Sequence, residues 1–197
     1  SQKMKSVFFK FFLIIFLFFS NVVLSKEDNK SKILQYLEDL KYFSASFIQN
    51  DGENLSEGKI YIGENRVRAE YFFPTKILII LDENKAMYYN YELEEDEFFN
   101  PKNTNAWFFY DVFRNPFFFE DAIFDIKDNE LIVIKEGVDS KGIKYFIKTN
   151  FENSPLILRN VMVNINGEKL ELSIFNHSYN EQFNKEFFKL INPQYLN

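Results

Sequence analysis

The sequence contains no cysteine, a single histidine and fewer basic than acidic residues. Without cysteine there is no disulfide framework, no thiolate metal site and no cysteine nucleophile. The lone histidine, His177, leaves most metal sites and catalytic triads without their commonest residue. The 23 basic and 29 acidic residues give a net charge of -6. Because phosphate binding requires clustered lysine and arginine, we expect no nucleic-acid partner.

The sequence also contains few residues that could carry out enzyme chemistry. A nucleophilic hydrolase needs a nucleophile, a base and an orienting group. His177 is the only conventional base, it stands at the end of an expected strand, and the chain has no Gly-x-Ser-x-Gly motif. The acidic run at residues 92–97 lacks the glycine and the ligand spacing of a calcium loop, and charge runs are usually solvated. We therefore predict that the protein is not an enzyme and needs neither a metal nor a cofactor. An exported serine hydrolase using His177 is the alternative.

The first 25 residues have the pattern of a secretory signal peptide. Lys3, Lys5 and Lys10 accompany an uncharged apolar run over residues 11–19, and a small residue, Ser25, ends the segment. A retained membrane anchor is the alternative, but a bilayer span needs roughly 20 apolar residues and this run is shorter. We predict cleavage after Ser25, export of the mature chain, and one domain over residues 26–197.

Aromatic residues are the component in excess, at 19% of the chain with 26 phenylalanines. One interpretation is a core that happens to be rich in phenylalanine. The other is a curved sheet whose aromatic concave face receives a lipidic ligand, a site that requires no titratable side chain.

The periodicity beyond the signal predicts one helix followed by many short strands. Ile33, Leu34, Leu37 and Leu40 have amphipathic helical spacing over residues 31–41. Alternating or apolar strand-length segments follow, and Asn166-Gly167 is a strong hairpin signal. Residues 104–122 lack this alternation and predict one or two short helices across an open face of the sheet. A last short strand is expected at residues 187–191. Together these patterns predict an antiparallel sheet that curves into a sandwich or barrel. The strands are expected at residues 43–49, 59–62, 67–71, 77–81, 86–91, 131–135, 143–149, 156–165 and 169–175.

Several segments, in order, resemble the LolA family of periplasmic outer-membrane lipoprotein carriers. The first is Phe-Ser-Ala-Ser-Phe-Ile-Gln at residues 43–49, similar to the family's F-x-A-S-F-x-Q strand. The third-strand segment Arg-Ala-Glu-Tyr-Phe-Phe-Pro at residues 68–74 is similar to R-(W/F)-E-Y-x-x-P. No single motif is specific, but their order and spacing are. The other matching segments are residues 57–62, 79–89, 115–117, 155–167 and 175–193.

The resemblance implies a mainly β fold, an incomplete antiparallel barrel of about eleven strands covered by short helices that form a lid. It further implies that a monomer takes acylated lipoproteins from the inner-membrane LolCDE transporter to a LolB acceptor at the outer membrane. The acyl chains would occupy an apolar cavity, with no chemical step in the carrier. A periplasmic lipid- or lipoprotein-sensing interaction domain of the same fold is the alternative function.

Site residues follow from matching the family and from strand alternation. If Val67 and Tyr71 face inward, Arg68 faces outward. Many members carry an Arg-Pro that holds the lid closed, which is absent here, and Arg66 is the candidate substitute for that latch. The family's tryptophan before Glu-Tyr is Ala69, and its hairpin glycine is Glu83. The expected cavity lining is Phe47, Ile60, Ile62, Val67, Tyr71, Leu78, Ile80, Met87 and Tyr89. The expected lid residues are Trp107, Phe108, Val112 and Phe113, for which a buried helix face is the alternative.

Overall fold

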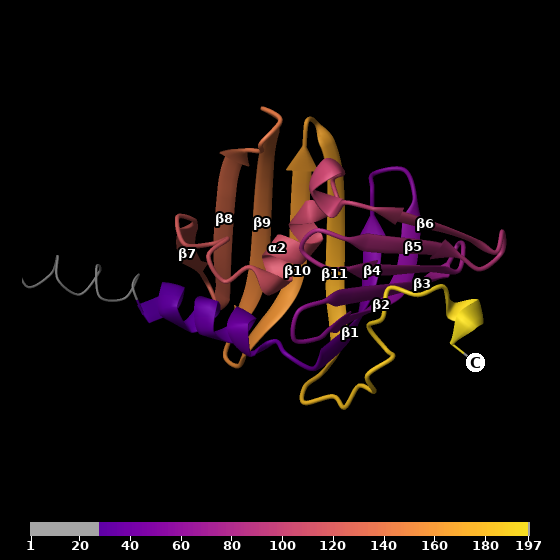
Figure 1. The fold of residues 1–197 in the computed structure, drawn as a ribbon. Coiled ribbons are helices and arrows are strands. Elements are labelled where there is room, and N and C mark those ends of the chain that lie inside the picture. The colour runs from indigo at the N-terminus through magenta and orange to yellow at the C-terminus, as the bar shows by residue number, and fades with distance from the viewer. Residues whose placement is uncertain (1–27, 197) are drawn as a thin grey trace, which may run out of the picture.

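The computed structural model describes residues 28–196, which form one curved antiparallel sheet with helices on it (Figure 1). The eleven strands of this described part lie in the order β6-β5-β4-β3-β2-β1-β11-β10-β9-β8-β7. Their bounds are β1 (Phe43–Asn50), β2 (Leu55–Ile62), β3 (Val67–Phe73), β4 (Ile77–Leu81), β5 (Ala86–Asn90), β6 (Glu95–Phe99), β7 (Ile123–Lys127), β8 (Glu130–Val138), β9 (Lys144–Asn153), β10 (Leu156–Ile165) and β11 (Glu168–Ser178). The expected signal peptide lies outside the described residues.

The sheet remains open. The first and last strands, β1 and β11, pair with each other at its middle, so β6 and β7 are its two edges. In Figure 1 the strands β8–β11 run across the direction of β3–β6, which is the strong twist expected of a half-barrel. The prediction of a mainly β, incomplete barrel covered by helices is confirmed.

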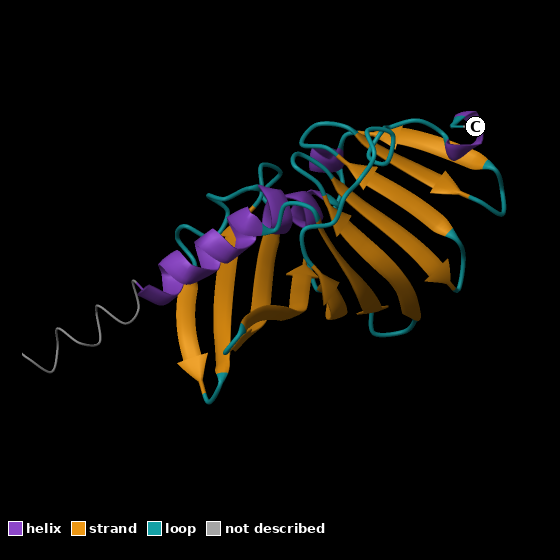
Figure 2. Cartoon of the chain, turned by 90° about the horizontal axis from the view of Figure 1, so that it is seen from below, coloured by secondary structure: helices purple, strands orange, loops and turns teal. Residues whose placement is uncertain are grey.

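Two helices lie on the same side of the sheet (Figure 2). The N-terminal helix covers residues 28–39 and buries Ile33 and Leu37, close to the predicted range. Helix α2 (Trp107–Arg114) occupies part of the predicted helical stretch at 104–122. Buried side chains of both helices belong to one apolar core with the inward residues of the strands, among them Phe47 and Ile60. Among residues 28–196, no helix combines the length and the apolar content that a bilayer span requires.

Strand alternation and turn chemistry explain the local register. In β3, Val67, Ala69 and Tyr71 pack against the helix-covered core, as the period of two predicts. Asn166 and Gly167 both have positive φ, 53° and 89°, and connect the paired residues at the ends of β10 and β11. This is the two-residue hairpin that the Asn-Gly pair predicted, since both positions favour left-handed backbone.

The segment after β11 differs from the prediction. No strand forms at residues 187–191; residues 181–196 instead make an irregular C-terminal strap that ends in the short 3-10 helix η2 (Pro193–Tyr195). The strap crosses the sheet face opposite the helices. The carbonyl oxygens of Phe187 and Phe188 accept hydrogen bonds from the guanidinium groups of Arg68 and Arg66, at 2.6 and 2.8 Å. Both carbonyls thus take part in the attachment of the strap to β3 and to the turn before it, and no residue of 181–196 pairs as a strand.

The acidic run forms part of an edge strand rather than a loop. Glu95, Asp96 and Glu97 lie in β6 with exposed side chains, so the expectation of solvated charge holds, although the strand itself was not predicted. Charged side chains on a free edge oppose pairing with the edge of another molecule.

Candidate functional site

An apolar cavity lies between the sheet and α2. Strands β1–β4 and β11 line it on the sheet side. Phe99 at the end of β6, Ala106 just before α2 and Phe109 in α2 line the other side. Its volume is about 70 Å³. The Tyr71 hydroxyl, which donates to Oε1 of Gln49 at 2.8 Å, is the one polar side-chain group among the lining residues. The lining consists of Phe47, Ile60, Val67, Ala69, Tyr71, Ile79, Leu81, Phe99, Ala106, Phe109, Leu172 and Ile174.

Four of the nine predicted lining residues border this cavity. Phe47, Ile60, Val67 and Tyr71 all face it, and the rings of Phe47 and Tyr71 meet edge to face with centroids 5.1 Å apart. Ile62 is fully buried in the same core but does not border the cavity.

The other four predicted lining residues lie on the opposite face of the sheet. Leu78, Ile80, Met87 and Tyr89 form a separate buried cluster, against which Leu190 of the C-terminal strap packs. Their assignment to the cavity is therefore corrected.

The pairing register explains this correction. Ala69 pairs with Ile79, so Ile79 shares the inward face of Ala69, whereas Ile80 pairs with outward-facing Arg68. Strand β4 is apolar on both faces, with Ile79 and Leu81 inward and Ile80 outward. Its sequence therefore carries no alternation from which the inward face could be read.

The predicted lid residues all belong to α2, but they do not line the cavity. Phe108, Val112 and Phe113 are buried in the core, and Trp107 faces a different pocket. The residue of α2 that covers the cavity is Phe109, which stacks on Phe108 with ring centroids 4.2 Å apart. The side of the helix that faces the cavity could not be recognised because α2 has aromatic residues on several sides.

Arg66 does not hold α2. Its Nε lies 3.0 Å from Oδ2 of Asp82, and its Nη1 donates to the carbonyl of Phe188 in the strap. Arg66 therefore connects the C-terminal strap to the β4–β5 turn and does not act as the predicted latch on α2.

Arg114, the last residue of α2, makes the contacts expected of a latch. Its guanidinium donates to the carbonyl oxygens of Gly63 at 2.9 Å, Glu64 at 3.2 Å and Leu37 at 3.2 Å. Burial lowers the pKa of Arg114, but the group stays protonated at neutral pH. The sequence signal that was overlooked is a basic residue in the last turn of the helix.

The two ends of α2 are held unequally. The C-terminal end is fixed by Arg114 and by buried Val112 and Phe113. At the other end, Ala106 occupies the N-cap position without a side-chain cap, and the buried Nε1 of Trp107 has no hydrogen-bond partner within residues 28–196. The N-terminal end of α2 therefore has fewer hydrogen bonds to the rest of the protein than its C-terminal end.

The titratable groups form no constellation of catalytic type in the described residues. His177 is half-buried, and its Nε2 lies 2.7 Å from the carbonyl oxygen of Leu158. Burial lowers the pKa of His177, which favours the neutral imidazole. Within residues 28–196, no three His, Asp or Glu side chains are grouped so as to hold a metal ion.

No protein-family model matches the sequence, and no curated protein is similar to it. Solved structures share the fold. An uncharacterized conserved protein from Thermus thermophilus is similar at 8% identity and a TM-score of 0.53, over 83% of this chain and 95% of that one. The complex of Pseudomonas aeruginosa MucA and MucB is similar at 9% identity and a TM-score of 0.47, over 82% of this chain. A second structure of MucB with MucA(peri) has a TM-score of 0.44 at 8% identity. This chain spans 60% and 58% of the matched chains of those two complexes. At such identities the similarity concerns the fold alone.

Proposed function

We propose that this protein is a periplasmic carrier that shields the acyl chains of lipoproteins in the cavity under α2. The cavity itself is the observation that carries the proposal, because its lining is apolar and it lies beneath a short helix fixed at one end. Shielding an acyl chain from water is favourable by about 0.8 kcal/mol per CH₂. Such a function needs binding and release but no catalytic group, so we propose no enzymatic step.

The size of the cavity requires that α2 move when cargo binds. At about 70 Å³ the space is far smaller than the roughly 300 Å³ at which ordinary ligand pockets begin. Displacing Ala106 and Phe109 would join the cavity to the space that α2 now fills. The acyl chains would then take the place of the apolar contacts that Ala106 and Phe109 make with the sheet.

The proposed route follows from the resemblance to LolA carriers. Cargo would be received from the LolCDE transporter at the inner membrane and passed to a LolB acceptor at the outer membrane. The expected signal peptide would deliver the chain to the periplasm, where it would act as a monomer. Each transfer requires only that the acceptor bind the acyl chains more favourably than the donor.

The test is detergent-free purification from a periplasmic extract, followed by mass spectrometry of the bound material. We expect acylated lipoprotein at one-to-one stoichiometry. Tyr71→Glu and Phe72→Glu form a matched pair, since each replaces an aromatic residue of β3 by a carboxylate. Tyr71 borders the cavity, whereas the Phe72 side chain is 55% exposed.

Only the variant at Tyr71 should lose cargo, because a carboxylate in the cavity would be desolvated beside an acyl chain. If both variants carried lipoprotein normally, the cavity would not be the cargo site. A wild-type protein that carries no lipid and fails to release lipoproteins from spheroplasts would instead support a sensing or interaction domain.

A further inference from the structure

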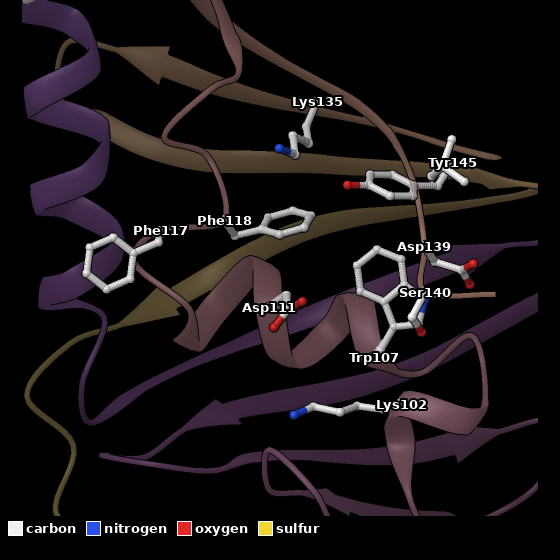
Figure 3. Close-up of a pocket in the computed structure, with 10 residues that line it drawn as sticks. Lys102, Trp107, Asp111, Phe117, Phe118, Lys135, Asp139, Ser140 and Tyr145 are labelled. Atoms are coloured by element: carbon white, nitrogen blue, oxygen red, sulfur yellow. The ribbon is translucent and has the colours of Figure 1, made fainter. Parts of the chain in front are cut away.

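A second pocket lies on another side of α2 (Figure 3). Trp107 and Asp111 of α2 form one wall, β8 and the start of β9 form another, and the turn after α2 contributes Phe118. Its volume is about 360 Å³, which falls within the range of small-ligand sites. The residues that line this pocket are different from those that line the carrier cavity.

Aromatic rings surround the space. The Trp107 ring lies 5.1 Å from the ring of Tyr145 and 6.0 Å from that of Phe118, centroid to centroid, and both contacts are edge to face. Figure 3 shows the three rings grouped around one space, with Asp111 on the same helix as Trp107. Aromatic walls of this kind recognise cations through the negative potential of the ring faces, and quaternary ammonium groups above all.

Both lysines that border the pocket are bound to other partners. Nζ of Lys102 donates to Oε1 of Glu83 and to Oδ1 of Asn84, each at 2.9 Å. Lys135 forms an ion pair with Asp121, and its Nζ lies 5.9 Å from the centroid of the Phe118 ring. Among the described residues, the rings of Trp107 and Tyr145 are therefore the ones without a lysine over them. Their charges are thus compensated by neighbouring side chains, and the pocket offers no free cation to a phosphate or carboxylate.

The negative groups are not compensated in the same way. Oδ1 of Asp139 accepts backbone N–H groups of its own loop. Asp111 is half-buried, receives one long hydrogen bond of 3.4 Å from Asn115, and forms no ion pair within residues 28–196. Burial raises the pKa of Asp111, and this effect exceeds the lowering caused by the Asn115 hydrogen bond and by the charge of Lys102. A cationic ligand would relieve the cost of that burial.

The Trp107 indole contributes its ring to the pocket and no hydrogen bond to a ligand. Its Nε1–H has no acceptor in the described part of the chain, but the atom is fully buried and is not exposed to the pocket. The rings and the Asp111 carboxylate are therefore the groups that a ligand can reach. We propose that the pocket binds an ammonium group, the chemistry of choline and ethanolamine, with the cation held by the rings and Asp111.

The chain offers a direct probe, because Trp107 is its only tryptophan. Titration with choline chloride, against sodium chloride at equal ionic strength, should give a saturable change in tryptophan fluorescence. Asp111→Asn should weaken binding about tenfold or more, since it removes the charge-assisted contact. Asp125→Asn makes the same chemical change at an exposed position of β7 and should leave the affinity unchanged.

A lipid headgroup could supply the same chemistry as free choline, so vesicles form the second arm of the test. Vesicles of phosphatidylcholine or phosphatidylethanolamine in phosphatidylglycerol should give the same Asp111-dependent change if the natural source is a headgroup, and pure phosphatidylglycerol should give none. Either choline or headgroup binding that depends on Asp111 supports the site. Absence of both, or equal binding by Asp111→Asn, overturns it. If circular dichroism shows that Asp111→Asn is unfolded, Tyr145→Leu with calorimetric titration takes its place, and unchanged affinity there also overturns the proposal.

Discussion

Replacing Arg114 by alanine should selectively loosen α2. The guanidinium joins the end of this helix to two other elements, through the carbonyl oxygens of Gly63 and Glu64 after β2 and of Leu37 in the N-terminal helix. A hydrogen bond from a charged group is worth about 1.5–3 kcal/mol, and water replaces part of it at the exposed carbonyl of Glu64. We therefore expect the free energy of opening α2 to fall by about 2 kcal/mol, which is roughly a 30-fold larger open population.

Native-state hydrogen exchange measures this opening directly. Amides of residues 108–114 should exchange roughly 30-fold faster in Arg114→Ala than in the wild type, while those of β1 and β2 change much less. Arg114→Lys keeps the charge but loses the fork of donors, so its exchange should lie between the two. Arg159→Ala removes an arginine that pairs with Glu152 on β9 and serves as the control.

Two results would refute this reasoning. Unchanged exchange in α2 would mean that buried Phe108, Val112 and Phe113 hold the helix without Arg114. Equal acceleration in α2, β1 and β2 would mean that Arg114 stabilises the whole fold and that α2 does not open by itself. In the carrier assay, the same variant should take up and release an acyl probe faster if opening limits both steps.

Three further predictions concern the cavity, the histidine and the strap. Ala69→Leu should fill the cavity of about 70 Å³ and raise the free energy of unfolding, measured in urea, by at most about 1.7 kcal/mol at 24 cal/mol per Å³. The same variant should co-purify with less lipid, which lipid analysis of the purified protein measures. Because burial lowers the pKa of His177 below 6.5, the unfolded chain binds its proton first, so stability should fall as pH drops below about 6.5 through the folded pKa. His177→Gln should flatten that slope in urea titrations between pH 7.5 and 5. Leu190→Ala should lower the free energy of unfolding by about 1–2 kcal/mol, because the side chain is only partly buried. The strap should then be cut more readily in limited proteolysis, while cargo is still bound. Loss of cargo would contradict the separation of the two faces of the sheet.

The sequence predicts the fold well where local signals are strong. Ile33 and Leu37 repeat at helical spacing, and the alternation of Val67, Ala69 and Tyr71 identifies the inward face of β3. The Asn166-Gly167 pair identifies a hairpin. Each of these features depends on residues close in the chain, so periodicity and turn chemistry suffice to detect it.

What could not be predicted depends on residues far apart. Strand β4 is apolar on both faces because the C-terminal strap covers one of them. No residue near Ile80 in the sequence indicates its contact with Leu190 of the strap. The family resemblance predicts the latch at Arg66, whereas the structure has Arg114 of α2 donating to the carbonyl of Gly63, 51 residues earlier in the chain. The three-dimensional arrangement of the elements decides which of the two arginines joins α2 to its neighbours.

The aromatic excess has a structural explanation at α2. Successive residues of a helix lie about 100° apart, so Ala106 and Phe109 share one side and Trp107 and Asp111 share another. The first side covers the apolar cavity and the second forms a wall of the ammonium pocket, while Phe108 packs into the core between them. A helix of eight residues that contacts protein on so many sides requires large apolar side chains at most positions. For this reason a ligand in either pocket would change the free energy of moving the same helix, and coupling between the two sites would be reciprocal.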